Sequence, residues 1–287
     1  MNVLVVGGTG TVGSLVAQEL LARRERPRVL TRHAEKILSL PTNVMGVVGD
    51  TGKPETLTPL LQGVEAVVLI TALSPREADE GRAVVEAARR AGVRRLVFLS
   101  VHDVEKCPEA PHFRSKVAIQ EAIEASGLAW TTVRPNNFFQ NDHWLRQPLM
   151  EHGVYPAPIG EVGLSRVDVR DIAEAIAIAA TESGHEGRRY PLVGPDVLDG
   201  PGTAAVWSRH LGREVRYGGN DLQAWAVHSR ALMPDWMVED LRIMYAFFQE
   251  KGLRASDADL REQARILPHP PRRFEDFVRE TAAAWRA

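Results

Sequence analysis

The sequence predicts an α/β protein in which a doubly wound parallel sheet carries helices on both faces. Short apolar runs alternate with helical patterns over the first two-thirds of the 287 residues. These runs are nearly continuous, which is typical of strands buried on both faces. Connections between neighbouring parallel strands are right-handed, so this alternation predicts one sheet with helices in front and behind.

The expected strands lie at 2–6, 27–32, 44–50, 66–73, 94–101 and 129–135, and most of them are short runs rich in valine, leucine and isoleucine. Apolar residues at helical spacing predict helices over 12–24, 57–61, 77–91 and 113–125. Gly92 and Gly127 follow the last two of these helices, at a position where glycine commonly ends a helix. After Pro135 the alternation stops, and only a helix over 168–181 and a strand in "RRYPLVG" resume it.

The last third of the chain is mostly helical and rich in aromatic and methionine residues. We therefore expect a nucleotide-binding domain over 1–135, with 166–194 returning to it. The segments 136–165 and 195–287 would form a smaller, mostly helical C-terminal lobe on the substrate side. The segment 231–248 is expected to pack as core or to close the lobe, with a substrate wall or partner surface as the alternative.

Composition limits the classes of function. The formal net charge is −2 and the isoelectric point is about 6.5, so the chain has no general attraction for nucleic acid. The single cysteine, Cys107, excludes an intramolecular disulfide and a multi-cysteine metal site, and the histidines lack the spacing of metal ligands. No apolar run reaches the ~18 residues that a membrane span needs, and no signal sequence precedes the first strand. We expect a cytoplasmic protein that binds no metal, membrane or nucleic acid.

The first expected strand runs directly into a glycine-rich loop, "GGTGTVG" at 7–13. Gly8, Gly10 and Gly13 match the spacing GxGxxG, which here follows a strand and opens a helix, as in dinucleotide-binding loops. The glycines allow a tight turn, the approach of a pyrophosphate and close packing of the helix, whose free N–H groups attract phosphate. A tight strand-to-helix turn with nothing bound is the alternative. The expected cofactor contacts in this loop are Gly7, Thr9, Gly10, Thr11, Val12 and Gly13.

The end of the second expected strand bears on the choice between NAD and NADP. An acidic residue usually holds a free ribose 2′-hydroxyl there, but this chain has Arg32 in "LTRHAEK". A guanidinium can hold a 2′-phosphate with paired charged hydrogen bonds, and His33 and Lys36 could add to them. The sequence therefore favours NADP(H) over NAD(H), with a solvated basic strand end as the alternative. Further cofactor contacts are expected at Asp50, Thr71 and Pro135, although Asp50 could equally cap a turn.

These motifs resemble those of the atypical short-chain dehydrogenase/reductase superfamily, and together they resemble its NmrA-like branch. The resemblance is carried by GGTGTVG, LTR, the GD after the third strand, FLSV, HFRSK, TTVRPNNFFQN, VDVRDIAEAI and YPLVGP. It covers the chain to about Gly194 and continues weakly in "RRFEDFVRETAAAW". It implies a Rossmann fold that binds NAD(P) and carries a small C-terminal substrate lobe. The branch includes NADPH-dependent reductases of quinones, dyes and phenolic compounds, and also dinucleotide sensors that regulate protein partners.

Enzymes of that superfamily typically use a serine after the fifth strand and a Tyr-x-x-x-Lys motif on the next helix. The resemblance places Ser100 and Lys116 at two of these catalytic positions, whereas His112 stands where the tyrosine is expected. Residues four apart share one helix face, so His112 could donate the proton in place of the phenol. Alternatively, Lys116 acts alone, or it only orients a cofactor that does not react.

The segment "RPNNFFQN" follows the sixth strand, at the carboxyl edge where open α/β sheets bind ligands. Amide side chains there could hydrogen-bond a substrate, and phenylalanine rings could stack on an aromatic one. Burial of both phenylalanines in the lobe core is the alternative. The expected substrate contacts are Asn136, Asn137, Phe138 and Phe139.

Two functions from different classes fit these observations. The first is an NADP(H)-dependent oxidoreductase that reduces a small electron-poor substrate, quinone-like or aromatic, by hydride transfer. Such acceptors need less from the protein than a ketone does, so the missing tyrosine is compatible with this function. The second is a non-catalytic NADP(H)-binding redox sensor that acts through a protein partner. An isomerase that uses the cofactor transiently is a third alternative, and a homodimer is compatible with the sequence.

Overall fold

The computed structural model describes residues 1–286, and Ala287, which ends the expected lobe, lies outside the described residues. The chain divides into two compact units. The first consists of Met1–Glu105, His112–Arg134 and Val169–Tyr190. The second consists of Lys106–Pro111, Pro135–Asp168 and Pro191–Ala287. The assignment of one domain to the nucleotide and the other to the substrate stays a prediction.

The first unit is built on a seven-stranded sheet in the order β3-β2-β1-β4-β5-β6-β8. Its strands are β1 (Asn2–Val6), β2 (Arg26–Thr31), β3 (Met45–Val48), β4 (Ala66–Leu69), β5 (Arg95–Leu99), β6 (Ala129–Pro135) and β8 (Arg188–Leu192). Neighbouring strands from β3 across to β6 are parallel. The direction of strand order changes between β1 and β4, and in open α/β sheets ligands bind beyond the carboxyl ends of the strands at such a point. The glycine loop follows β1 at this edge.

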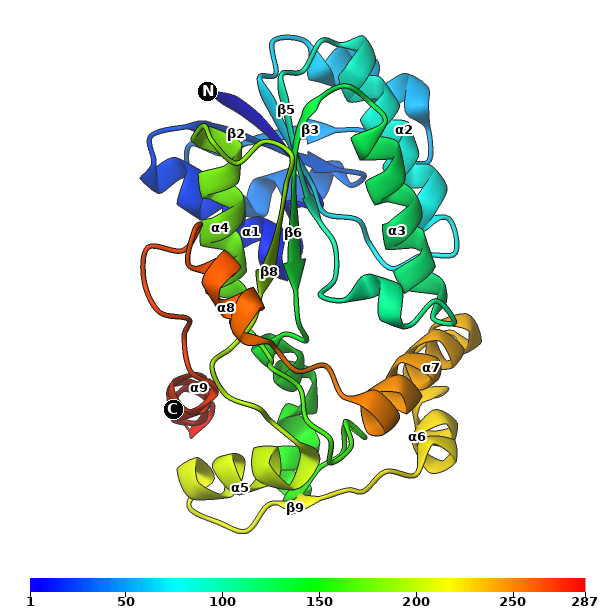
Figure 1. Cartoon of the computed structure of the whole chain (residues 1–287), viewed down its shortest axis with the longest axis vertical. Helices are drawn as coiled ribbons and strands as arrows, with labels where there is room; N and C mark the ends of the chain where they lie inside the picture. Colours follow the sequence, from blue (N-terminus) through cyan, green and yellow to red (C-terminus); the bar gives the residue numbers. More distant parts are fainter. Residues whose placement is uncertain (287) are drawn as a thin grey trace. The chain divides into compact units, whose positions relative to one another are not determined.

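Helices cover both faces of this sheet (Figure 1). On one face lie α1 (Thr11–Ala22) and α4 (Val169–Thr181), which pack against each other. On the other face lie α2 (Glu77–Arg90) and α3 (Pro111–Glu124). Buried side chains of neighbouring strands and helices form the core, among them Leu4, Val67, Phe98 and Ile119. This arrangement confirms the doubly wound α/β fold that the sequence predicts.

Two elements of the first unit differ from the sequence prediction. β4 ends at Leu69 instead of residue 73, because β1 turns into the glycine loop and leaves β4 without that partner beyond Ile70. The helix expected over 57–61 is instead a pair of short 3₁₀ turns, Pro54–Thr56 and Thr58–Leu61. Pro59 has no N–H to donate inside a continuous α-helix that starts at Pro54, and each of the two turns is too short to form an α-helix alone.

The second unit holds the predicted helical part of the chain (Figure 1). Within the described residues its helices are α5 (Gly200–Leu211), α6 (Leu222–Ser229), α7 (Asp235–Lys251), α8 (Asp257–Gln263) and α9 (Phe274–Arg286). Two short strands, β7 (Val154–Tyr155) and β9 (Arg216–Tyr217), pair in parallel, which the sequence did not predict. Within 231–248, Val238, Met244 and Phe248 on α7 are buried, whereas Leu232 and Trp236 are exposed, so only part of this segment packs as core. Across residues 1–286, every helix is too short or too polar to span a lipid bilayer.

Aromatic side chains attach α9 to the rest of the second unit. The rings of Trp207 on α5 and Trp285 on α9 stack with 4.9 Å between their centroids. Phe274 and Phe277, also on α9, lie 5.2 and 5.7 Å from the ring of Phe139. Trp207, Phe139, Phe274 and Phe277 are buried by these contacts, and Trp285 is half-buried.

Candidate functional site

The glycine loop between β1 and α1 contains two glycines that the chain itself requires. Gly7 has a φ of +78°, which side-chain-bearing residues rarely adopt, and a Cβ there would lie 2.3 Å from the carbonyl oxygen of Ile70. A Cβ on Gly13 would lie 2.3 Å from the carbonyl oxygen of Gly7. These glycines therefore allow the turn and the close packing of α1 on the loop.

Gly10 differs from these two glycines. Its φ is −87°, which any residue can adopt, and an added Cβ would meet only the carbonyl oxygen of Gly7, at 3.4 Å. It is exposed, as are Thr9 and Thr11 beside it. Gly10 is also the N-cap of α1 and offers no side-chain acceptor to the first N–H groups of the helix. The loop is thus open toward solvent at a helix N-terminus, an arrangement that suits an anion such as a pyrophosphate.

Arg32 lies at the same edge of the sheet. It follows β2 directly, and β2 pairs in parallel with β1 such that Leu30 lies opposite Val6. This pairing ends at Val6 and Leu30, and Arg32 follows two residues later, just past the carboxyl end of β2. Its side chain is exposed and has no ion-pair partner among residues 1–286. It is therefore available to a ligand phosphate.

Two other expected helpers at this edge are engaged locally. The imidazole of His33 lies 3.3 Å from a carboxylate oxygen of Glu35. The carboxylate of Asp50 accepts a hydrogen bond of 2.9 Å from the backbone N–H of Gly52, which favours the alternative role of Asp50 as a turn cap. Lys36 is exposed.

Lys116 on α3 is held in a buried polar cluster. Its ammonium lies 2.9 Å from Oε1 of Glu77, donates to Oγ1 of Thr71 at 2.7 Å and reaches the carbonyl oxygen of Leu99 at 3.3 Å. Thr71 in turn donates to Oε1 of Glu77 at 2.6 Å. Lys116 also lies 5.4 Å from the ring centroid of Phe98. Side chains and backbone from β5, α2, α3 and the segment after β4 therefore meet at one ammonium group.

Sequence analysis did not identify Glu77 as part of this cluster. Its exposed fraction is 1% and it is the first residue of α2. In the sequence it resembles an ordinary acid in the first turn of a helix, since Asp79 and Glu80 follow it. Only the fold shows that the first of these three acids is buried against Lys116.

The other two expected catalytic residues are His112, which lies on the same helix as Lys116, and Ser100, which follows Leu99 in the chain. Ser100 follows β5, is 3% exposed, and donates its backbone N–H to the carbonyl of Val133. Its hydroxyl oxygen has no hydrogen-bond partner within residues 1–286. His112 is half-buried on α3, one turn before Lys116, with its ring 4.6 Å from that of Phe113 in an edge-on geometry. Ser100 is thus a buried polar residue at the carboxyl end of β5.

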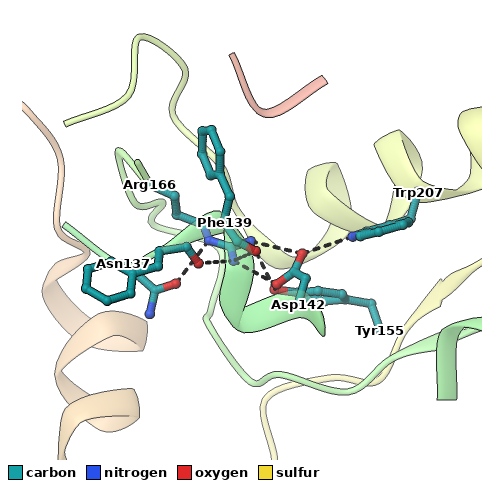
Figure 2. Close-up of polar contacts among 7 residues, drawn as sticks. Asn137, Phe139, Asp142, Tyr155, Arg166 and Trp207 are labelled. Carbon is teal, nitrogen blue, oxygen red and sulfur yellow. Dashed lines mark hydrogen bonds and ion pairs between the residues drawn. The ribbon is translucent and has the colours of Figure 1, made fainter. Parts of the chain in front are cut away.

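The expected substrate segment lies in the second unit, around a buried ion pair (Figure 2). The guanidinium of Arg166 donates to Asp142 at 2.7 Å and to the side-chain oxygen of Asn137 at 3.0 Å. Asp142 also accepts hydrogen bonds from the Tyr155 hydroxyl and the Trp207 indole. Further donation from Arg166 to the carbonyl of Phe138 shapes the backbone of the same segment.

Charges inside this cluster are balanced by one another. Although burial opposes its charge, the carboxylate of Asp142 raises the pKa of Arg166 above the ordinary value. Burial raises the pKa of Tyr155 well above its ordinary value, so the phenol stays protonated and donates to Asp142. The sequence did not predict this cluster, because Asp142 and Arg166 stand 24 positions apart with no pattern linking them.

The four expected substrate contacts occupy different environments. Asn136 is 1% exposed, and its side chain donates to the carbonyl of Leu253 and accepts from the N–H of Asn137. Phe139 is 1% exposed within the aromatic core around α9, which favours the alternative core role over stacking on a substrate. Asn137 and Phe138 are half-buried. Pro135, an expected cofactor contact, is buried at the end of β6.

Within residues 1–286 we also considered two other kinds of site, a nucleophilic cysteine and a bound metal ion. Cys107 is buried, and burial raises the pKa of its thiol, which disfavours a nucleophilic thiolate. Residues 1–286 contain no group of three or more histidine, cysteine, aspartate or glutamate side chains placed to hold a metal ion.

The sheet topology and the open glycine loop define an α/β protein with a Rossmann-type fold. The model of the NmrA-like family matches residues 1–278, and the chain belongs to this family. The family resemblance carried by the motifs is thereby confirmed.

Two relatives match the chain over 99% of its length and 99% of their own. One is the NAD(P)H azoreductase of Xenophilus azovorans, 35% identical over 291 residues. The other is the (4-alkanoyl-5-oxo-2,5-dihydrofuran-3-yl)methyl phosphate reductase of Streptomyces griseus subsp. griseus, 35% identical over 285 residues. Among solved structures, an NADPH-dependent quinone oxidoreductase of Escherichia coli complexed with NADPH superposes with a TM-score of 0.87 at 24% identity, over 97% of this chain and 99% of that one. This likeness confirms the fold.

Proposed function

We propose that the chain is an NAD(P)H-dependent reductase that transfers a hydride to a small electron-poor acceptor, such as a quinone or an azo dye. The observation that carries the proposal is the exposure of Gly10 at the N-terminus of α1. The packing of the chain does not itself require a glycine at this position. A pyrophosphate needs such an approach to the backbone. The chain is 35% identical, over 99% of its length, to a relative named NAD(P)H azoreductase, which supports this class of cofactor and acceptor.

The residues of the first unit suit the roles that hydride transfer requires. When bound, the nicotinamide supplies the hydride, and the protein holds the reactants and delivers a proton. In this proposal Lys116 holds the ribose beside the nicotinamide, and the buried hydroxyl of Ser100 hydrogen-bonds the ligand. His112, one helical turn from Lys116, donates the proton that accompanies hydride uptake by the acceptor.

The substrate contacts are proposed to be Asn137 and Phe138, which are half-buried. The side-chain oxygen of Asn137 is occupied by Arg166, so the amide N–H₂ group is the end that can donate to an acceptor oxygen. In Figure 2 this nitrogen points away from the Arg166 guanidinium. Asn136 and Phe139 are proposed to support this segment from the core.

Arg32 is proposed to select NADP(H) through the 2′-phosphate. A charge-assisted hydrogen bond contributes about 1.5–3 kcal/mol, so Arg32→Ala should weaken NADPH binding roughly 10- to 100-fold. NADH binding should change less than about twofold. Arg26→Ala is a matched control, since Arg26 is an exposed arginine at the opposite end of the same strand. Equal losses for both cofactors would show that Arg32 does not contact the 2′-phosphate.

Turnover by the purified chain tests the enzyme class. We expect oxidation of NADPH, followed by its absorbance, in the presence of a benzoquinone or an azo dye, and a loss of at least about tenfold in kcat for Lys116→Ala. Tight NADPH binding without oxidation by any acceptor would contradict a reductase and favour the redox sensor. The sensor is not favoured at present, because both relatives at 35% identity are named as enzymes.

A further inference from the structure

The ammonium of Lys116 has as many acceptors as it has protons. It carries three N–H groups, and the three acceptors are Glu77, Thr71 and the carbonyl of Leu99. The contacts with Glu77 and Thr71 are 2.9 and 2.7 Å, whereas the contact with Leu99 is 3.3 Å and is the weakest of the three. A ligand that takes one N–H of Lys116 would therefore replace Leu99 at the smallest loss.

Thr71 and Glu77 act together in this geometry. The Thr71 hydroxyl has one proton, which it donates to Oε1 of Glu77, and it accepts from Lys116 with an oxygen lone pair. Its only donor is thus committed inside the protein, which suits a support for Lys116 better than a donor to the cofactor. Glu77 is placed at the N-terminus of α2, where the helix dipole stabilises a carboxylate.

We propose that Glu77 is a positioning residue, which, with Thr71, fixes two N–H groups of Lys116 so that the third is aimed at the bound ligand. This inference rests on the proposed function, since it concerns the orientation of the lysine that holds the cofactor. Small misplacements of such a group lower rates strongly, because catalysis depends on aligned contacts. Glu77 itself touches neither cofactor nor substrate in this proposal.

The test compares Glu77→Gln with a control on the same helix. Glu77→Gln keeps the shape and an acceptor oxygen but removes the charge, and we expect a 10- to 100-fold lower kcat, with KM for the quinone changed less than about threefold. We expect NADPH affinity, measured by fluorescence titration, to fall about three- to tenfold. Glu77→Asp, which restores the charge, should recover part of both losses. Glu80→Gln removes a neighbouring carboxylate that pairs with Arg76, and should leave both values unchanged.

A Lys116→Met background separates positioning from a general structural role. If Glu77 acts through Lys116, adding Glu77→Gln to Lys116→Met should change NADPH affinity and kcat less than about twofold further. Where Glu77→Gln fails to fold, Thr71→Val replaces it, because it removes the second anchor of Lys116 without altering a charge. The expected losses for Thr71→Val are of the same kind and smaller.

The outcomes distinguish this inference from the proposed function. Wild-type turnover together with unchanged kcat and NADPH affinity in Glu77→Gln would overturn the positioning role alone. Equal losses with and without the Lys116 side chain would also overturn it, because Glu77 would then act by another route. A wild-type chain that binds no dinucleotide would refute the proposed function, and the positioning role would fall with it.

Discussion

The sharpest prediction concerns Gly10, because the structure separates its role from that of its neighbours in the loop. In Gly10→Ala the new methyl group would have one close neighbour, the carbonyl oxygen of Gly7 at 3.4 Å, and the φ of −87° suits alanine. Replacing a glycine N-cap by alanine should therefore lower the free energy of unfolding by only about 0.5–1 kcal/mol. If the loop binds a pyrophosphate as proposed, the same methyl group at the N-cap would obstruct its approach to the first N–H groups of α1.

The expected loss of cofactor affinity follows from the hydrogen bonds at stake. Hydrogen bonds to a charged phosphate contribute about 1.5–3 kcal/mol each, and displacing the phosphate should break at least one. Gly10→Ala should thus weaken NADPH and NADH binding by at least roughly 10-fold, with the melting temperature nearly unchanged. Fluorescence titration and thermal denaturation of the same preparation measure the two quantities.

Gly13→Ala is the informative contrast. Its methyl group would lie 2.3 Å from the carbonyl oxygen of Gly7 and 2.6 Å from Cα of Gly8, so backbone must move. Overpacking of this kind typically destabilises by about 1–3 kcal/mol, and a clear drop in melting temperature should accompany any loss of binding. Wild-type affinity in a folded Gly10→Ala variant would refute the assignment of this loop to a pyrophosphate. A strongly destabilised Gly10→Ala variant would refute the packing argument instead.

Two further predictions concern buried ion pairs, and a third concerns the half-buried His185. Asp142→Ala should lower the free energy of unfolding by about 3–5 kcal/mol, since Arg166 is then buried without the carboxylate that pairs with it. A loss below about 1 kcal/mol, measured by denaturant titration, would contradict the described cluster. Glu77→Gln and Lys116→Met should each lower the free energy of unfolding, because each change leaves one buried partner unpaired. The double variant should lose less free energy of unfolding than the sum of the two single variants. Additive losses would mean that the two groups do not interact. Burial lowers the pKa of the His185 imidazole below its ordinary 6.5. The unfolded chain therefore protonates this imidazole more readily, and the contribution of His185 to stability is lost as the pH falls below about 6.5. An NMR titration midpoint of His185 at or above 6.5 would contradict this prediction.

The sequence predicts the sheet well where the physical signal is strong. The run 2–6 matches β1, because nearly continuous apolar residues that end at a glycine turn have few alternatives to a buried parallel strand. The run 129–135 matches β6, where Thr131, Thr132 and Val133 are β-branched and Pro135 ends the strand. The pair of β7 and β9 was missed, since a two-residue strand is too short to show a period. The end of β4 was placed too late because it depends on where a neighbouring strand turns away, which the β4 sequence does not encode.

In the candidate site, too, residues within a local motif could be predicted from the sequence, whereas residues placed by long-range contacts could not. The glycine loop was predictable because its motif is local, and the conformation of Gly7 and the packing of Gly13 supply a physical reason for each residue. Glu77, Asp142 and Arg166 were not predictable, since a charged residue in a sequence is usually exposed and only long-range contacts bury these three. Burial also decided between the alternatives for Phe139, which no local pattern could do.

The cluster around Lys116 also explains how this chain can carry histidine at position 112. In the related dehydrogenases the tyrosine and the lysine share one helix face, and the lysine supports the phenol. Here the three protons of Lys116 are satisfied by Glu77, Thr71 and Leu99, none of which lies on its own helix. The orientation of the lysine therefore does not depend on residue 112, and under the proposed function histidine there could take over proton donation without loosening the lysine. A quinone-like acceptor tolerates that change better than a ketone, because its electron-poor ring takes up hydride with less help from an acid.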